Sequence, residues 1–330
     1  MRKLLLSSSA LVAAASISSY AVADVSVTGG FEWAYTSTSS GIAASDGTSF
    51  ATDNEVVINF SNKTDTGLTI GGKVELDIDG GQPAGGASTV NDESVLTVSG
   101  GFGTFRLGQE DPIDETFGID EQDLIDEEGN GLFTSATLGN TSNLGLGGDA
   151  NKIAYLTPTM GGFQAGYSLA DSGDNETTDT NAIGASYTMP IGGGSIVVKY
   201  NQATKDGTTD TDTTNMGVKL SMGAMTLIAS SGTKEIASDE DIEGNGFAIK
   251  YDMGGGMTIA AATVEVTDEL DKSGTEEEKY TANIGEVVYT VAPGLDAKVT
   301  YTDYEYKNGG STAAGDDSGQ ITNLTITAAF

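Results

Sequence analysis

Short segments in which apolar and polar residues alternate recur along the chain, separated by clusters rich in Gly, Asp, Asn and Thr. In three of them the apolar side chains take one side of a strand and the polar ones the other: Leu68, Ile70, Val74, Leu76 and Ile78 against Thr69, Lys73, Glu75 and Asp77; Ile196, Val198 and Tyr200 against Lys199 and Asn201; Phe247, Ile249, Tyr251 and Met253 against Lys250 and Asp252. A period of two predicts β-strands with one apolar face. A soluble β-sandwich shows the same alternation, so periodicity alone leaves the class of β-protein open.

Sixteen such segments can be placed, and they predict an all-β fold with one domain over residues 24–330. We expect strands at 24–36, 54–62, 67–78, 92–99, 103–109, 150–157, 162–170, 180–188, 194–203, 213–221, 223–232, 245–253, 256–266, 279–291, 294–305 and 319–330. An even strand number, with about 19 residues for each strand and its connection, suits a transmembrane antiparallel β-barrel.

The connections between these segments alternate between short and long. Tight turns rich in Gly or Pro lie at 64–67, 100–101, 158–162, 190–194, 222–223, 254–256 and 293–294, and would face the periplasm. Longer acidic stretches at 170–179, 204–214, 233–245, 267–279 and 307–319 would form external loops.

The N-terminus predicts export. Arg2 and Lys3 precede an apolar stretch over 4–17, and Ala21-Val22-Ala23 matches a cleavage site, so we expect residues 1–23 to be a cleaved signal peptide. Without Arg2 and Lys3, the 15 basic residues fall to 13 against 48 acidic ones, a net charge of −35. A chain this acidic has no basic face for phosphates, which excludes nucleic-acid binding.

Two further absences in the sequence favour a closed barrel. The Cys count is 0, so an exported chain must draw its stability from a hydrogen-bonded structure without disulfides. No stretch after residue 23 approaches the ~18 consecutive apolar residues of a membrane helix. If the chain crosses a bilayer, it must therefore do so as a closed barrel, and sixteen strands make a barrel wide enough to hold water.

Two short motifs resemble a known family. Residues 100–108, Gly-Gly-Phe-Gly-Thr-Phe-Arg-Leu-Gly, resemble the turn and fifth strand that precede the inward-folded third loop of Gram-negative general porins. Leu324, Ile326, Ala328 and Phe330 resemble the C-terminal signal of outer-membrane barrels. Two positions depart from the family pattern: Gln109 stands where members often carry Arg, and Ala328 where an aromatic residue is common.

The resemblance implies a sixteen-stranded homotrimer in the Gram-negative outer membrane, in contact with lipid and lipopolysaccharide. It also implies that the barrel assembly machinery reads Phe330 as an assembly signal, and that the connection between the fifth and sixth strands forms a constriction inside the pore.

That connection, 110–149, is far longer than an ordinary loop, and long loops are usually functional or disordered. Its predicted constriction carboxylates are Glu110, Asp111, Asp114, Glu115, Asp120, Glu121 and Asp123, followed by Asp126, Glu127 and Glu128. Folded inward, these charges would place a negative potential where screening is weakest. The alternative is a solvated external loop whose charges only keep the surface soluble. Residues 114–118, Asp-Glu-Thr-Phe-Gly, resemble the acidic turn at the tip of the family's loop.

Basic side chains are scarce, and those within the expected strands take the parity opposite to their apolar neighbours. We expect all of them to line the pore: Lys73, Arg106, Lys152, Lys199, Lys219, Lys250 and Lys298. Avoidance of lipid explains this parity without any specific role, because Lys or Arg facing the bilayer midplane costs about 2–4 kcal/mol. Lys73 and Arg106 lie on strands two apart, about 10 Å across the sheet. Together they would form a basic patch facing the acidic loop.

Tyr and Trp residues fall near the expected strand ends, as the aromatic girdles of a membrane barrel require, although a soluble β-protein would also bury its Tyr residues. We assign Trp33, Tyr35, Tyr155, Tyr167, Tyr187, Tyr200, Tyr251, Tyr280, Tyr289, Tyr301 and Phe330 to these girdles. The apolar parity switches between Ile284 and Val287, which predicts a β-bulge at Gly285 or Glu286.

The sequence gives catalysis little support. With 0 His and 0 Cys, it lacks the usual general base, the commonest metal ligand and the thiol nucleophile. We therefore predict no catalytic residue, no metal site and no cofactor. Adventitious Ca²⁺ could bind acidic loops such as 171–179 and 206–212, although their spacing matches no dedicated calcium loop.

The sequence thus predicts a porin whose water-filled channel passes small hydrophilic solutes and ions by passive diffusion, with a preference for cations. The alternative is an exported structural surface protein, of the surface-layer or adhesin-like kind, which would also be acidic and free of Cys. A secreted calcium-binding β-roll lacks the tandem glycine-rich repeats it needs.

Overall fold

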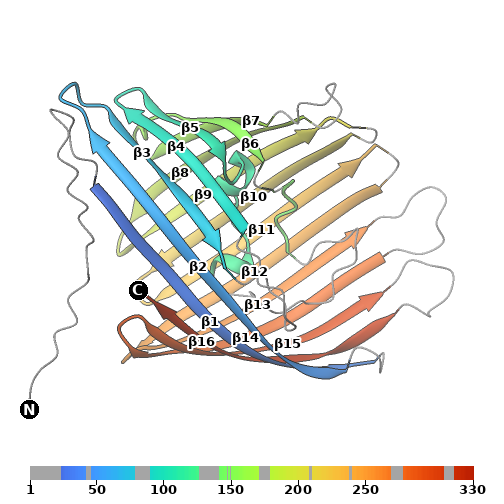
Figure 1. Ribbon diagram of the computed structural model, residues 1–330. Coiled ribbons are helices and arrows are strands. Elements are labelled where there is room, and N and C mark those ends of the chain that lie inside the picture. Colours follow the sequence, from blue (N-terminus) through green and yellow to red (C-terminus); the bar gives the residue numbers. More distant parts are fainter. Residues whose placement is uncertain are drawn as a thin grey trace, which may run out of the picture.

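The computed structural model describes residues 24–41, 46–78, 90–125, 141–146, 148, 150–170, 179–207, 210–237, 240–268, 278–307 and 316–330. Within these ranges the chain forms sixteen antiparallel strands closed into one barrel (Figure 1). The strands are β1 (Asp24–Ser40), β2 (Gly47–Lys63), β3 (Thr69–Asp77), β4 (Val90–Gly100), β5 (Gly103–Gln109), β6 (Asn151–Leu156), β7 (Phe163–Ala170), β8 (Thr180–Ile191), β9 (Gly194–Lys205), β10 (Thr211–Met222), β11 (Met225–Ile236), β12 (Glu240–Gly254), β13 (Met257–Asp268), β14 (Glu278–Ala292), β15 (Leu295–Lys307) and β16 (Asp317–Ala329). The predicted signal peptide at 1–23 lies outside the described residues and stays a prediction.

Each strand pairs with its neighbours in sequence, and β1 pairs with β16 to close the barrel. At this seam the two backbone hydrogen bonds between Gly29 and Phe330 are both 3.0 Å long, so the ladder continues to Phe330. A Cβ atom added at Gly29 would lie 3.1 Å from the Phe330 ring. The absence of a side chain at Gly29 therefore leaves room for the terminal ring beside it.

The outer wall carries an apolar band. Tyr167, Tyr187, Tyr200, Tyr251, Tyr289 and Tyr301 all face outward and are 40–51% exposed, together with Phe, Leu, Ile, Val and Met neighbours. Large apolar side chains on the outside of a closed barrel are what a lipid environment requires. Within the described residues, neither helix is long or apolar enough to cross a membrane.

The sixteen predicted strands are confirmed, but several run farther toward the long-loop end than expected. The predicted external loop at 233–245 is mostly strand, because β11 continues to Ile236 and β12 begins at Glu240. Likewise β2 begins at Gly47, seven residues before its predicted start at 54. In β11 and β12 the added residues lie above the apolar band, on its long-loop side, where the outward Glu235, Asp241 and Glu243 are polar and the sequence pattern no longer matches a membrane strand. The added part of β2 still carries an outward aromatic residue, Phe50, which is 60% exposed and stacks on Trp33.

On β14 and β15 the apolar face changes sides along the strand. Val299 and Tyr301 face outward, whereas Tyr304 and Tyr306 are buried on the inner face and Asp303 faces out. On the short-turn side the wall presents its apolar face to the outside, as contact with lipid requires. On the long-loop side the wall resembles a sheet of a soluble protein, because its apolar face is buried inside the barrel and its polar face points outward.

This change explains the parity switch that predicted a β-bulge at Gly285 or Glu286. That prediction is wrong, because β14 pairs with β15 without interruption from Lys279↔Lys307 to Thr290↔Asp296. Ile284 is buried on the inner face and Val287 is exposed on the outer face of the same regular strand. Tyr280, assigned above to a girdle, also lies inside the barrel and is 1% exposed.

Candidate functional site

The described residues between β5 and β6, which are 110–125, 141–146, 148 and 150 and are here called the inner segment, fold into the barrel. This segment carries α1 (Ile113–Thr116), which contacts β7, β8 and β9, and the 3₁₀ helix η2 (Glu121–Asp123), which contacts β11, β12 and β13 (Figure 1). Strands β5 and β6 have only 7 and 6 residues, so the chain leaves the wall early and enters the interior. The inward interpretation of this connection is therefore correct for the described part.

Apolar side chains hold the first half of the inner segment against the wall. Ile113 and Phe117 are 0% and 2% exposed, and they pack with Ala154, Leu156, Ala182 and Ala203. A Cβ atom at Gly166 would lie 2.7 Å from the Phe117 ring, and one at Gly184 would lie 2.5 Å from it. Only glycine leaves room for the ring at these two wall positions.

The second half is held by a larger core on the other side of the barrel. Ile119, Leu124, Ile125 and Leu144 of the inner segment belong to one cluster with inward side chains of β11–β16: Ile228, Ile242, Ala248, Ala262, Val264, Val266, Tyr280, Ala282, Ile284, Tyr304, Tyr306 and Ile321. This cluster is the core that covers the inward apolar face of the upper wall. The inner segment is thus a packed element of the fold.

Backbone groups of the inner segment pair with inward side chains of the wall. Ser168 Oγ accepts a hydrogen bond from the Ile113 amide at 3.1 Å. Lys199 Nζ donates to the carbonyl oxygens of Thr116 at 3.1 Å and Gly118 at 2.9 Å, at the end of α1. A lysine at this end also complements the negative pole formed by the last carbonyl groups.

Two of the predicted constriction carboxylates are buried and join the two arms of the inner segment. Asp114, 0% exposed, accepts a hydrogen bond from the Leu146 amide at 2.9 Å. Glu121, 1% exposed, accepts from the Ser142 amide at 3.0 Å and from Ser142 Oγ at 2.6 Å. These two acids organise the segment and do not face open solvent.

Other predicted carboxylates face a cavity of about 420 Å³ between the arms, lined by Glu115, Gly118, Asp120, Gln122, Asp123, Thr141, Asn143 and Gly145. Glu115 and Asp123 are exposed, and Asp123 lies 3.5 Å from Lys219 Nζ. Burial, with Glu121 and Asp123 adding repulsion, raises the pKa of Asp120 to about 7. Asp120 also caps η2 by accepting from the Gln122 amide at 3.1 Å.

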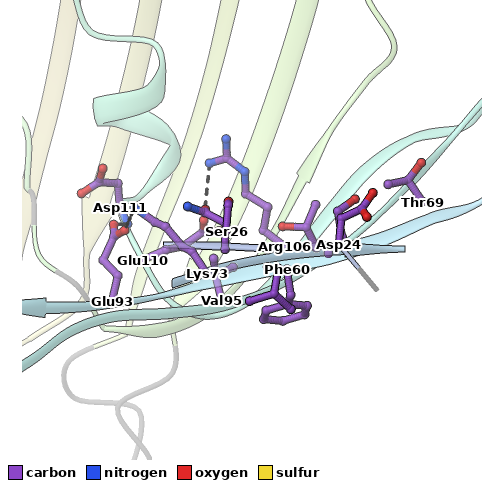
Figure 2. A pocket seen from close by; sticks show the side chains of 16 residues that line it. Asp24, Ser26, Phe60, Thr69, Lys73, Glu93, Val95, Arg106, Glu110 and Asp111 are labelled. Atoms are coloured by element: carbon purple, nitrogen blue, oxygen red, sulfur yellow. Dashed lines mark hydrogen bonds and ion pairs between the residues drawn. The ribbon is translucent and has the colours of Figure 1, made fainter. Parts of the chain in front are cut away.

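A second cavity, of about 600 Å³, lies beside the start of the inner segment and is lined by residues of β1–β5 together with Glu110 and Asp111 (Figure 2). Lys73 and Arg106, the two residues of the predicted basic patch, both line it. Lys73 is bound by Glu75 and Glu93, and Arg106 lies 3.5 Å from Glu110. Both cations are therefore paired with acids, Lys73 with two of the wall and Arg106 with one at the start of the inner segment, so the unpaired basic patch that the sequence suggested is not present.

Glu110 lies at the entry to the inner segment and is 4% exposed. Its backbone carbonyl accepts a hydrogen bond from Lys152 Nζ, which also donates to the Gly148 carbonyl at 2.9 Å. Burial raises the pKa of Glu110, and the opposing attraction of Arg106 and Lys152 is smaller. Burial likewise raises the pKa of Glu121.

The remaining predicted basic residues also lie on the inner face. Lys250 shares its parity with Ala248, which is 0% exposed, and Lys298 is itself 6% exposed. The structure thus places all seven basic side chains away from the apolar outer band. It brings Lys73 and Arg106 to one cavity and Lys199 and Lys219 to the acidic turn around Asp120.

Sequence reasoning missed the wall residues that receive the inner segment. Gly166, Gly184, Gly217, Gly244 and Gly246 lie within strands and face inward, and a Cβ atom at each would come within 3.0 Å of inner-segment atoms. Single glycines inside strands indicate close approach of another backbone, and this signal was available in the sequence.

A metal site finds no support in the described residues, which contain no group of three or more acidic side chains arranged to hold an ion. The acidic loop at 171–178 lies outside the described residues, as do 208–209 of the second candidate loop. Adventitious calcium binding there stays a prediction.

Comparison with known proteins gives one family and many structures. The family model for Gram-negative porins matches residues 7–309. No curated protein matches the chain. The anion-selective porin from Comamonas acidovorans superposes with a TM-score of 0.69 at 18% identity, covering 94% of this chain and 100% of that one.

Two further structures are similar in fold. The outer-membrane protein OmpT of Vibrio cholerae, in its trimer form, gives a TM-score of 0.67 at 12% identity over 93% of this chain and 99% of that one. A triple mutant of Rhodopseudomonas blastica porin gives 0.67 at 15% identity over 93% and 100%. At these identities the structures establish the barrel architecture, and the chemistry of the interior has to be argued from this chain.

Proposed function

Because the chain belongs to the Gram-negative porin family, and is thus an outer-membrane channel, we propose that it passes small hydrophilic solutes and ions by passive diffusion. The observation that carries this proposal is the inner segment, which lies inside a closed sixteen-stranded barrel and is fixed to the wall. Charged side chains line the two cavities beside it. A channel narrowed at one level and lined with charge selects solutes by size and by sign.

The proposed preference is for cations. Acidic residues outnumber basic ones in the whole chain, 48 against 15. Inside the barrel, Lys73 and Arg106 are paired with carboxylates, while Asp111 and Glu115 are exposed. The similar Comamonas porin is named anion-selective. Similarity in fold therefore does not indicate which ions this channel prefers, and the proposed cation preference rests on the side chains of this chain alone.

The proposed assembly is a homotrimer whose outer face contacts lipid and lipopolysaccharide. The trimer form of the similar Vibrio cholerae protein and the exposed apolar outer band support it. Phe330 remains the proposed signal for the barrel assembly machinery, and the residue is 72% exposed. The family assignment argues against the alternative of a surface-layer or adhesin-like protein.

Single-channel recording in a planar bilayer with a salt gradient tests the function. We expect stepwise openings and a reversal potential of the cation-selective sign. An Asp111→Asn/Glu115→Gln variant removes two exposed inner charges and should move the reversal potential toward anions. Asp303→Asn, on the outer face, is the matched control and should not. Well-folded protein without openings would refute the channel; openings with an anion-selective reversal would refute only the cation preference.

A further inference from the structure

One cross-strand row of the barrel wall has an unusual composition. The pairing register runs Gly166↔Gly184, Gly184↔Asn201, Asn201↔Asn215, Asn215↔Gly232 and Gly232↔Gly244, so six neighbouring strands, β7 to β12, contribute two glycines, two asparagines and two glycines. The four glycines face the inner segment: a Cβ atom at Gly166 or Gly184 would press on Phe117, and one at Gly232 or Gly244 on Ser142.

The two asparagines at the centre of this row bind both arms of the inner segment. Asn201 Nδ2 donates to the Phe117 carbonyl at 3.2 Å, in the first arm. Asn215 Oδ1 accepts from the Leu144 amide at 2.8 Å, in the second arm. Asn215 Nδ2 donates to Asn201 Oδ1 at 2.9 Å, which links the two amides across the strands. The result is one relay, from Leu144 through both amides to Phe117.

Burial gives this relay its importance. Asn201 is 0% exposed and Asn215 is 4% exposed, so water cannot replace a lost partner. A buried polar group without a partner is strongly unfavourable. The flanking glycine takes part as well, because a Cβ atom at Gly232 would collide with Asn215 Oδ1. A side-chain amide supplies a donor on one atom and an acceptor on another, whereas an ionised carboxylate of the same reach supplies acceptors only.

We propose that Asn201 and Asn215 are positioning residues that set the width of the channel, by fixing both arms of the inner segment to one row of the wall. The proposal rests on the proposed channel function. Neither side chain faces a passing solute, so each acts through the inner segment. Removing either amide breaks the chain of hydrogen bonds, and both arms of the inner segment should then be displaced from the wall together.

The test compares Asn201→Ala, Asn215→Ala and the double variant with wild type and with Gln202→Ala. Gln202 is the matched control, since it adjoins Asn201 but is exposed on the opposite face of β9. Each single variant should populate displaced states of the inner segment on the order of tenfold more than wild type. Recordings should then show an altered main conductance with frequent substates. The double variant should resemble the singles, because one relay is broken in each case.

A second readout is independent of conduction. The chain has 0 Cys, so a spin label at Gln122→Cys, exposed on η2, reports only on the inner segment. The label should gain mobility in both Asn→Ala variants and not in Gln202→Ala, while heat-modifiable migration on gels shows that the barrel is folded. If wild type conducts and the Asn variants match it in conductance and label mobility, the inference is wrong. If wild-type protein does not conduct, the proposed function fails, and label mobility alone then decides whether the relay holds the segment.

Discussion

Asp120 should give the channel a pH-dependent selectivity near neutrality. Its pKa is raised from 3.8 to about 7, first by burial and then by repulsion from Glu121 and Asp123. The side chain is therefore about 90% ionised at pH 8 and about 10% ionised at pH 6. Acidification across this range removes close to one negative charge from the cavity between the two arms.

The size of the effect follows from Coulomb's law. A unit charge roughly 8 Å from a passing ion, at an effective dielectric constant of about 40, changes the ion's energy by ~1 kcal/mol, or about fivefold in its partition. Salt at ~0.1 M has a screening length of about 10 Å and reduces this to roughly two- to threefold. The reversal potential should thus move in the anion direction as the pH falls through about 7.

The raised pKa of Asp120 also makes stability depend on pH, and the sign of this dependence is fixed. Because the pKa is higher in the folded protein, the contribution of Asp120 is fully present below the unfolded value of 3.8 and is lost as the pH rises through about 7. A pKa that differs by one between the folded and unfolded protein corresponds to about 1.4 kcal/mol, reduced here because solvent partly reaches the side chain. Docking of η2 should therefore be tighter in acid than above neutrality.

Reversal potentials of single channels, measured in steps from pH 5 to pH 9, test the reasoning. Wild type should show a midpoint near 7, and Asp120→Asn should remove it. Asp123→Asn removes one repulsive neighbour and should move the midpoint to lower pH. Glu115→Gln removes a charge from the same cavity and should change selectivity at every pH without moving the midpoint. A midpoint near 7 that persists in Asp120→Asn would refute the assignment.

Three further outcomes are expected. Phe117→Ala should lower the free energy of packing the inner segment against the wall by about 3–5 kcal/mol, because the ring fills the space over Gly184. A protease should then cut the inner segment faster in folded barrels, and an unchanged cleavage rate would contradict this packing. Val299→Lys should lower the free energy of unfolding, measured with denaturant in vesicles, by roughly 2–4 kcal/mol. Asp303→Lys, on the same face but above the apolar band, should leave it nearly unchanged. An equal loss of stability in both variants would refute the change of face along β15. Phe330→Ala should lower the yield of heat-modifiable barrel on refolding by loosening the seam at Gly29, and an unchanged yield would confine the residue to a role in assembly.

The fold could be read from the sequence because membrane strands obey a local rule. Lipid outside and water inside impose an alternation that each strand satisfies by itself, so Phe247, Tyr251 and Lys250 reveal their faces without knowledge of any neighbour. The same rule predicted the strand number and the inward position of the seven basic residues, while Gly and Pro residues predicted the tight turns. It failed above the apolar band, where Ile284 and Tyr304 pack inside and the rule no longer applies.

The sequence by itself thus determined the strands of the barrel and their connections, since these depend on periodicity, turn residues and loop length. The entry of the 110–149 connection into the barrel was expected from the resemblance to porins, and the residues alone left it open. Only the tertiary structure decided which carboxylates are buried and join the two arms by hydrogen bonds, such as Asp114 and Glu121, and which are exposed inside the barrel, such as Glu115. Those roles depend on contacts between residues far apart in the chain. The row through Asn201 and Asn215 exists only once the register of six strands is fixed.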